Sequence, residues 1–134
     1  LLLKQYKFSA IHFNNGLHGW GYTEEQYRDG LLKTVAAVKE HSGDATIIWA
    51  TTTPVRESSD LQKFSEKTER VKVRNKLASE IMKENGASTN DLFELVKDHA
   101  DWQSKDGVHF NAAGNEGLAK QVAESVSESL RLGR

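Results

Sequence analysis

Short apolar runs and amphipathic stretches alternate along this chain. Residues 9–14, "SAIHFN", form an apolar-rich run, and residues 46–53, "TIIWATTT", are β-branched and nearly free of charge. Both runs predict strands, and the second is typical of a strand covered on both faces, as in a parallel sheet. Residues 87–95, "ASTNDLFEL", are a weaker strand candidate, because Asn90 and Asp91 are poor strand formers.

Apolar positions at helical spacing follow the two stronger strands. Thr23 is expected to cap the first helix, because "TEEQ" is a capping box with Gln26 three residues after the cap, and Gly43 lies just past the end. Residues 55–62, "VRESSDLQ", are polar and predict a loop, after which a long helix closes near Gly86. The apolar positions of the two helices are Tyr27, Leu31, Val35 and Val38 in the first, and Leu61, Phe64, Val71, Leu77 and Ile81 in the second.

The charged stretch 66–74 is read as the solvated face of the second helix. Residues 96–110 predict a loop or short helix, and a final helix follows. Its face carries Leu118, Val122, Val126 and Leu130. The order strand, helix, strand, helix, weak strand, loop, helix predicts an α/β layer fold with a parallel sheet. No repeat or linker interrupts it, so residues 1–134 are expected to form one domain.

Composition narrows the choice of function. The chain has 18 Lys and Arg against 19 Asp and Glu, so neither nucleic acid nor an acidic membrane surface is indicated as a partner. The longest apolar run is far shorter than a membrane span. The chain has no Cys, which excludes a disulfide framework, a thiolate zinc site and a Cys nucleophile. It has no Gly-rich phosphate loop, and the sequence does not indicate a compartment.

Three polar segments are predicted to meet at one edge of the sheet. Residues 14–20 follow the first strand and residues 53–56 follow the second, while Asp106 and His109 lie in the loop before the last helix. In open α/β sheets the working site lies outside the carboxyl ends of the strands. The three segments are therefore expected to converge on one cleft.

Asp106 and His109 stand three residues apart in "KDGVHF". An Asp that accepts a hydrogen bond from the imidazole Nδ1–H fixes the tautomer and leaves the other ring nitrogen free to take a proton from a nucleophile. The alternative is a polar loop in which Asp106 and Gly107 simply form a turn. A metal site made of His18, Asp106 and His109 is a further alternative, although its spacing matches no standard zinc pattern.

The segment "FNNGLHGWG", residues 13–21, offers amide, imidazole and backbone N–H groups. Such donors could stabilise an oxyanion. The candidates are Asn14, Asn15, Gly16 and His18. The alternative is again an ordinary turn, since Asn-Gly is a common turn pair.

Taken together, these segments resemble the later part of an SGNH hydrolase, the GDSL-type esterase and lipase family. "DGVHFNAAGNEGLA" resembles the last block of the family, and "IHFNNGLHGWGYTEEQYRDGL" resembles its block of a strand, a G-x-N-D motif and a helix. "TIIWATTTPV" resembles the strand that follows. The resemblance implies a three-layer α/β/α sandwich with a parallel sheet, the flavodoxin-like SGNH fold.

The resemblance also implies roles for individual residues. Asp106 and His109 match the triad acid and base, and residues 16–19 fall where G-x-N-D is expected. His18 therefore stands in the place of the oxyanion Asn, and the donor would come from His18, Asn15 or Asn14. The implied activity is a serine esterase acting on small acyl esters, such as acetylated carbohydrate, with no metal and no organic cofactor.

One feature of the family is not found in this sequence. The family's nucleophilic Ser belongs to a G-D-S motif after an earlier strand, and no serine of this chain follows Gly-Asp. The resemblance thus implies that the Ser and one or more N-terminal strands lie upstream of residue 1. Without them the sheet would have an unpaired edge, so a missing N-terminal segment, or a homo-oligomer, is expected to complete it. The alternative is a non-catalytic binding or scaffolding domain with an esterase-like shell.

Overall fold

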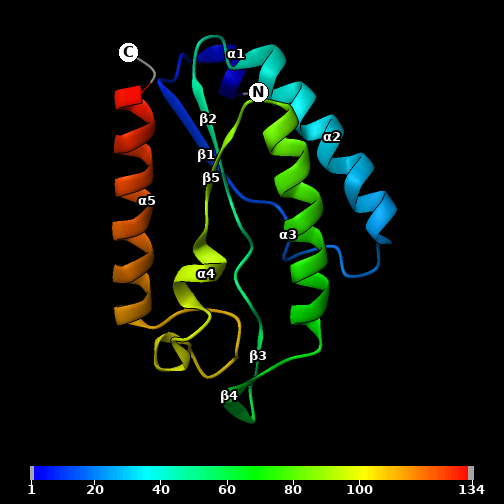
Figure 1. Cartoon of the computed structure of the whole chain (residues 1–134), viewed down its shortest axis with the longest axis vertical. Coiled ribbons are helices and arrows are strands. Elements are labelled where there is room, and N and C mark those ends of the chain that lie inside the picture. Colours follow the sequence, from blue (N-terminus) through cyan, green and yellow to red (C-terminus); the bar gives the residue numbers. More distant parts are fainter. Residues whose placement is uncertain (1, 133–134) are drawn as a thin grey trace.

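A three-stranded parallel sheet forms the middle layer of the molecule (Figure 1). The structure is a computed structural model that describes residues 2–132. The strands are β1 (Ala10–Phe13), β2 (Thr46–Ala50) and β5 (Ser88–Asn90), in the order β1-β2-β5. Both pairings are parallel. The parallel α/β sheet predicted from the alternation of elements is confirmed.

Helices cover both faces of this sheet. The helices α2 (Glu24–His41) and α3 (Lys67–Glu84) lie on one side, and α5 (Ala112–Leu132) lies on the other (Figure 1). The three-layer α/β/α arrangement is therefore also confirmed. The shorter elements are α1 (Leu2–Gln5), β3 (Arg56–Glu57), β4 (Asp60–Phe64), α4 (Leu92–Val96) and the 3₁₀ helix η1 (Ala100–Trp102).

The apolar core lies between the sheet and the pair α2 and α3. Its central side chain is Trp49 of β2, and Phe13 of β1 packs at its margin. The buried members of the cluster are Tyr27, Leu31, Val35, Trp49, Ala78, Ile81 and Met82. Strand β2 is covered on both faces, since Ile48, Trp49 and Ala50 are all buried. This is the burial that its uncharged sequence predicted.

The opposite face of the sheet is more polar. The Asn90 amide nitrogen lies 3.1 Å from the His12 Nε2, and Gln121 of α5 donates to the Asn90 Oδ1 over 3.2 Å. Burial lowers the pKa of His12, which favours the neutral ring that can accept from Asn90.

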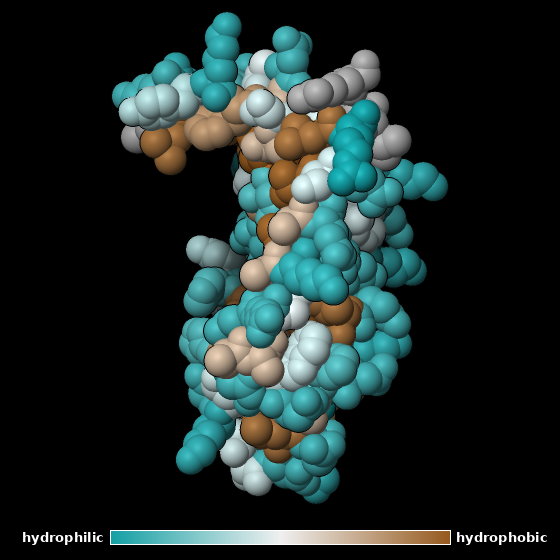
Figure 2. All heavy atoms as spheres, turned by 90° about the vertical axis from the view of Figure 1, so that its left-hand side faces the viewer, coloured by the Kyte–Doolittle hydropathy of each residue, from teal (hydrophilic) through white to brown (hydrophobic). Residues whose placement is uncertain are grey.

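The apolar stripe of α5 is only half-buried. Figure 2, which looks at this side, shows apolar surface gathered in the upper half above a hollow.

The first helix begins as its capping box predicted. The Thr23 hydroxyl accepts from the Gln26 N–H over 3.2 Å, and the Gln26 side chain accepts from the Thr23 N–H over 2.9 Å. The second helix ends at Glu84, just before Gly86, as expected. The weak strand candidate divides in two, because the Asp91 carboxylate accepts from the Glu94 N–H and starts α4.

The segment between β2 and α3 differs from its prediction. Residues 55–62 were expected to be a polar loop and Leu61 and Phe64 to belong to a helix, but β3 and β4 form an antiparallel hairpin and α3 begins at Lys67. The cause is the buried Arg56. Its guanidinium lies 4.5 Å from the centroid of the Phe64 ring and donates to the Leu61 carbonyl over 3.0 Å. The apolar side chain of Phe64 therefore packs on a cation rather than on a helix neighbour.

Strand β2 ends at Ala50, earlier than the predicted Thr53. Beyond it the Asn75 side chain of α3 takes the role of a neighbouring strand. Its Oδ1 accepts from the Thr52 N–H over 2.9 Å, and its Nδ2 donates to the Thr52 carbonyl over 2.8 Å. A helix side chain thus satisfies the backbone where the sheet stops.

The strand β1 forms one edge of the sheet. Among residues 2–132 it pairs with β2 on one side and with no strand on the other. Large apolar side chains near the start of the chain are exposed, including Leu2, Tyr6 and Phe8. No helix among the described residues is long and apolar enough to cross a membrane.

Candidate functional site

Asp106 and His109 form a contact through their side chains. The Asp106 Oδ2 lies 2.7 Å from the His109 Nδ1. The other carboxylate oxygen accepts from the N–H groups of Val108 and His109, over 2.8 and 2.9 Å. One carboxylate therefore shapes the turn and orients the imidazole at the same time.

The electrostatics of this pair keep the Asp106 carboxyl ionised. The hydrogen bond with the His109 side chain, followed by the two backbone N–H groups, lowers the pKa of Asp106 to about 2. The ionised carboxylate holds the proton of a neutral imidazole on Nδ1, which leaves Nε2 as an acceptor. The His109 side chain is 80% exposed, so its ring is accessible to a second reactant.

The loop that carries the pair closes on itself. The Ser104 N–H donates to the His109 carbonyl over 2.7 Å, and the Gly107 N–H donates to the Ser104 carbonyl over 3.0 Å. The Asn111 N–H donates to the Trp102 carbonyl over 2.9 Å, and the Asn111 side chain caps α5 by accepting from the Gly114 N–H. The backbone of residues 102–114 is thus held mainly by its own hydrogen bonds.

Gly107 joins this loop to the β3–β4 hairpin. Its carbonyl accepts from the Arg56 N–H over 2.8 Å. Its φ is +72°, and a Cβ there would lie 2.1 Å from the Arg56 carbonyl oxygen. Both the backbone angle and the close approach require glycine. The turn containing Asp106 is therefore anchored to the start of β3 through one residue that has no side chain.

The segment after β1 is fixed by Asn14. Its amide nitrogen donates to the Ala50 carbonyl over 2.7 Å and to the Thr52 hydroxyl over 3.1 Å. An amide has two N–H groups, so both are engaged in joining the ends of β1 and β2. Gly16, the next candidate, is buried. Asn14 therefore has no free donor for a substrate.

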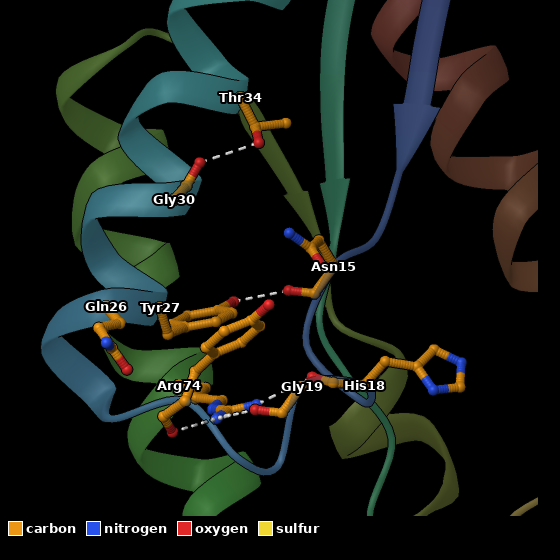
Figure 3. A pocket seen from close by; sticks show the side chains of 9 residues that line it. Asn15, His18, Gly19, Gln26, Tyr27, Gly30, Thr34 and Arg74 are labelled. Carbon is orange, nitrogen blue, oxygen red and sulfur yellow. Dashed lines mark hydrogen bonds between the residues drawn. The ribbon is translucent and has the colours of Figure 1, made fainter.

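All three residues Asn14, Asn15 and His18 are exposed, but the side chains of Asn15 and His18, unlike that of Asn14, make no hydrogen bond within residues 2–132. The backbone of Asn15 is held by Tyr27, whose hydroxyl donates to the Asn15 carbonyl over 2.6 Å. Burial raises the pKa of Tyr27 to about 12, which keeps this donor protonated. Figure 3 shows that the His18 imidazole points away from Tyr27 and Arg74, across the loop backbone.

A cavity of about 480 Å³ lies behind this loop. Its lining residues are Asn15, His18, Gly19, Tyr22, Gln26, Tyr27, Gly30, Thr34 and Arg74 (Figure 3). His18 belongs to this lining, and its ring is directed away from Tyr27 and Arg74.

A cluster of charged residues that the sequence did not predict packs against the loop after β1. Arg74 was read as part of a solvated helix face, but its side chain is fully buried. The Glu24 carboxylate accepts from the Nε of Arg70 over 2.7 Å and from the Nε of Arg74 over 2.9 Å. Burial tends to raise the pKa of Glu24, but its hydrogen bonds with Arg74 and Arg70 lower it overall. The only sequence signal was an Arg at a helix position that faces the core.

The candidate residues fall into two groups. Asp106 and His109 are in contact, whereas no hydrogen bond or ion pair in the described part of the chain joins either of them to the loop after β1. Among the same residues no group of three His, Asp or Glu side chains could hold a metal ion. The metal trio of His18, Asp106 and His109 is therefore not assembled.

The model of the GDSL-like lipase/acylhydrolase family matches residues 13–116. This range includes both loops described above. No curated protein sequence matches the chain.

Several solved structures have a fold similar to that of this chain. A peptidoglycan O-acetylesterase superposes with a TM-score of 0.77 at 16% identity, covering 92% of this chain and 38% of that chain. A lipase/acylhydrolase from Enterococcus faecalis gives 0.67 at 18% identity, covering 88% and 60%. An acetyl xylan esterase gives 0.69 at 14% identity, covering 88% and 67%. The chain thus spans less than two thirds of the length of the first two structures.

Proposed function

This chain belongs to the GDSL-like lipase/acylhydrolase family, and from that premise we propose that it carries the acid–base and oxyanion-binding part of a serine esterase. The observation that carries the proposal is the contact of 2.7 Å between the His109 Nδ1 and the Asp106 carboxylate. Substrates would be small acyl esters. The reaction needs no metal and no organic cofactor, because the imidazole itself moves the proton.

In the proposed reaction His109 acts first as a base. Its Nε2 takes the proton of a serine hydroxyl while the serine oxygen attacks the ester carbonyl. The ionised Asp106 stabilises the imidazolium that results. The tetrahedral intermediate then collapses, the imidazolium returns the proton to the leaving alcohol, and an acyl-enzyme remains. Water repeats the same two steps, releasing the carboxylic acid and the free serine.

The serine would be supplied by residues upstream of this chain. No serine within it follows a Gly-Asp pair. The unpaired edge of β1 and the short share of the related structures that the chain covers support this part of the proposal. A further strand beside β1 would bring its carboxyl end to the same edge of the sheet as the loop after β1.

Acetylated carbohydrate is the substrate class that we favour. Two proteins with the same fold are described as a peptidoglycan O-acetylesterase and an acetyl xylan esterase. The exposed ring of His109 agrees with a bulky polymeric alcohol, because such a leaving group needs an open approach.

The proposal is tested by replacing His109 in the complete gene product. General acid–base catalysis contributes about 10²–10⁴-fold to rate, so His109→Ala should lower turnover of p-nitrophenyl acetate by at least about 10²-fold. His41→Ala is the matched control, since His41 is an imidazole at the end of α2 and belongs to neither loop. Undiminished turnover by His109→Ala would contradict the role of this residue.

A second candidate function is a non-catalytic binding domain that retains the esterase fold. The observations that favour it are the absence of a Gly-Asp-Ser motif and the presence of His18 where an Asn is expected. This candidate predicts that an organophosphate probe does not label the complete gene product. Covalent labelling of an upstream serine, lost when His109 is replaced, would exclude it.

A further inference from the structure

All N–H groups of the Arg74 guanidinium are hydrogen-bonded, and most of them bind the loop after β1. Its Nη1 donates to the carbonyls of Gly16 and His18 over 3.3 and 3.1 Å, and its Nη2 donates to the carbonyls of Gly19 and Tyr22 over 3.1 and 3.3 Å. Its Nε donates to Glu24. An arginine has five N–H groups, so every one of them has an acceptor. Four of these acceptors belong to one loop.

A second arginine holds the far end of the same loop. Arg70 donates to the Trp20 carbonyl over 2.7 Å and to the Tyr22 carbonyl over 2.6 Å. The Trp20 ring lies over both guanidinium groups, with centroid distances of 5.7 Å to Arg70 and 5.4 Å to Arg74. Glu24 supplies one negative charge between the two cations. The loop is therefore fixed from beneath by a compact and partly neutralised cluster.

This arrangement determines where the peptide N–H groups of the loop point. In a planar trans peptide the C=O of one residue and the N–H of the next are antiparallel. Because the carbonyls of Gly16 and His18 face Arg74, the N–H groups of Leu17 and Gly19 face away from it. The His18 imidazole lies on that same far side (Figure 3).

These two N–H groups have no acceptor in the described part of the chain. The backbone hydrogen bonds of the loop include Tyr22 donating to the Gly19 carbonyl, but no bond from Leu17 or Gly19. Two unpaired backbone donors directed to one side resemble the donors that stabilise an oxyanion. The free amide that Asn14 could have offered is already engaged between β1 and β2.

We propose that the N–H groups of Leu17 and Gly19, turned outward by Arg74, are donors to the oxyanion of the tetrahedral intermediate. Arg74 is then a positioning residue and does not touch the substrate. The assignment rests on the esterase function proposed above. It explains how a chain with His18 in place of the expected Asn could still bind a developing negative charge.

The sharpest test removes one N–H group and keeps the loop. Leu17→Pro deletes the donor, whereas Leu17→Ala keeps it and shortens the side chain. In the complete gene product, loss of one oxyanion donor should lower kcat for p-nitrophenyl acetate by about 10²–10³-fold with KM nearly unchanged. Because Leu17→Ala keeps the N–H group, its loss of kcat should be at least about tenfold smaller than that of Leu17→Pro.

Replacing the positioning residue gives an independent measurement. Arg74→Lys keeps the charge but cannot reach four carbonyls with one ammonium group, so kcat should fall at nearly constant KM. Backbone amides of residues 16–20 should also exchange with solvent faster. Arg28→Lys, an exposed change on α2, is the control and should alter neither quantity.

The outcomes separate this inference from the proposed function. If His109→Ala abolishes turnover while a folded Leu17→Pro keeps the wild-type kcat, the donor assignment is wrong and the esterase stands. An equal loss in Leu17→Ala and Leu17→Pro would also overturn it, because the side chain would then be responsible. If no turnover depends on His109, the esterase fails and the donor assignment fails with it.

Discussion

The double use of the Asp106 carboxylate ties the shape of the loop to the state of the imidazole. One oxygen binds the His109 ring and the other binds two backbone N–H groups. The sequence allowed the first contact to be predicted, because a spacing of three residues in a tight loop brings the side chains together. It did not indicate the second, which depends on the backbone conformation of the turn.

The low pKa of Asp106 predicts how the loop responds to acid. A carboxyl whose folded pKa is about 2, below the ordinary value of 3.8, stabilises the folded loop fully above about pH 4. That contribution is lost as the pH falls through 2. NMR should therefore show the Asp106 carboxyl titrating near 2, with the Val108 and His109 amides shifting in parallel. A midpoint near 4 would show that the contact does not persist in solution.

Buried charge was the main feature that residue patterns failed to reveal. A helix face rich in Lys, Arg and Glu is usually solvated, and Arg74 lies within such a run. The loop carbonyls and the Glu24 carboxylate around its guanidinium make burial favourable. The donors of the proposed oxyanion site have the same origin, since no side chain marks a backbone N–H group.

At the scale of elements, helix and strand predictions were correct where they depended only on residues close together in the sequence. The capping box at Thr23 needs only residues close in sequence, and it is formed as predicted. The β3–β4 hairpin was missed because it depends on Arg56, whose Nη2 also donates to the Lys97 carbonyl, a residue far away in sequence. The spacing of apolar residues along the sequence does not reveal a hydrogen bond between residues so far apart.

The close contact between Gly107 and the β3–β4 hairpin predicts the cost of adding a side chain at Gly107. Gly107 and Gly86 have the same φ of +72°, but a Cβ at Gly86 would meet no atom within 4 Å. Gly86→Ala should therefore cost about 1–2 kcal/mol for the left-handed backbone alone. Gly107→Ala adds a clash with the Arg56 carbonyl and should cost at least about 2 kcal/mol more.

Urea unfolding of the two variants measures this difference. Gly107→Ala should also change the chemical shifts of the His109 ring, while Gly86→Ala, which lies past the end of α3, should not. Equal free energies of unfolding for the two variants would show that the loop moves away from the hairpin without cost.

For the whole molecule, the distribution of apolar surface is the informative feature. The order of the layers followed from the alternation of strands and helices, and among residues 2–132 β1 has a neighbouring strand on one side alone, as expected. The sequence did not show how much of each helix face is buried by neighbouring elements. The stripe of α5 looked like an ordinary buried face, yet its side chains are only half-buried, because burial depends on neighbours and not on the helix itself.

Residues 1–134 expressed alone should therefore behave differently from the complete gene product. An unpaired edge strand and exposed apolar side chains favour association, so the isolated chain should bind a hydrophobic dye and form larger species as its concentration rises. Light scattering and dye fluorescence measure both effects. The complete gene product should show neither. A monomeric isolated chain without dye binding would argue against a missing neighbour at β1.

The loop of residues 102–114 has one further consequence. Its shape depends on bonds among Trp102, Ser104, Gly107, His109 and Asn111 more than on the surrounding protein. A segment held by its own hydrogen bonds can keep its conformation in another protein. Transplanted ahead of a helix in an unrelated α/β protein, with Gly107 and a backbone N–H in the place of that of Arg56 kept, it should present an oriented imidazole there.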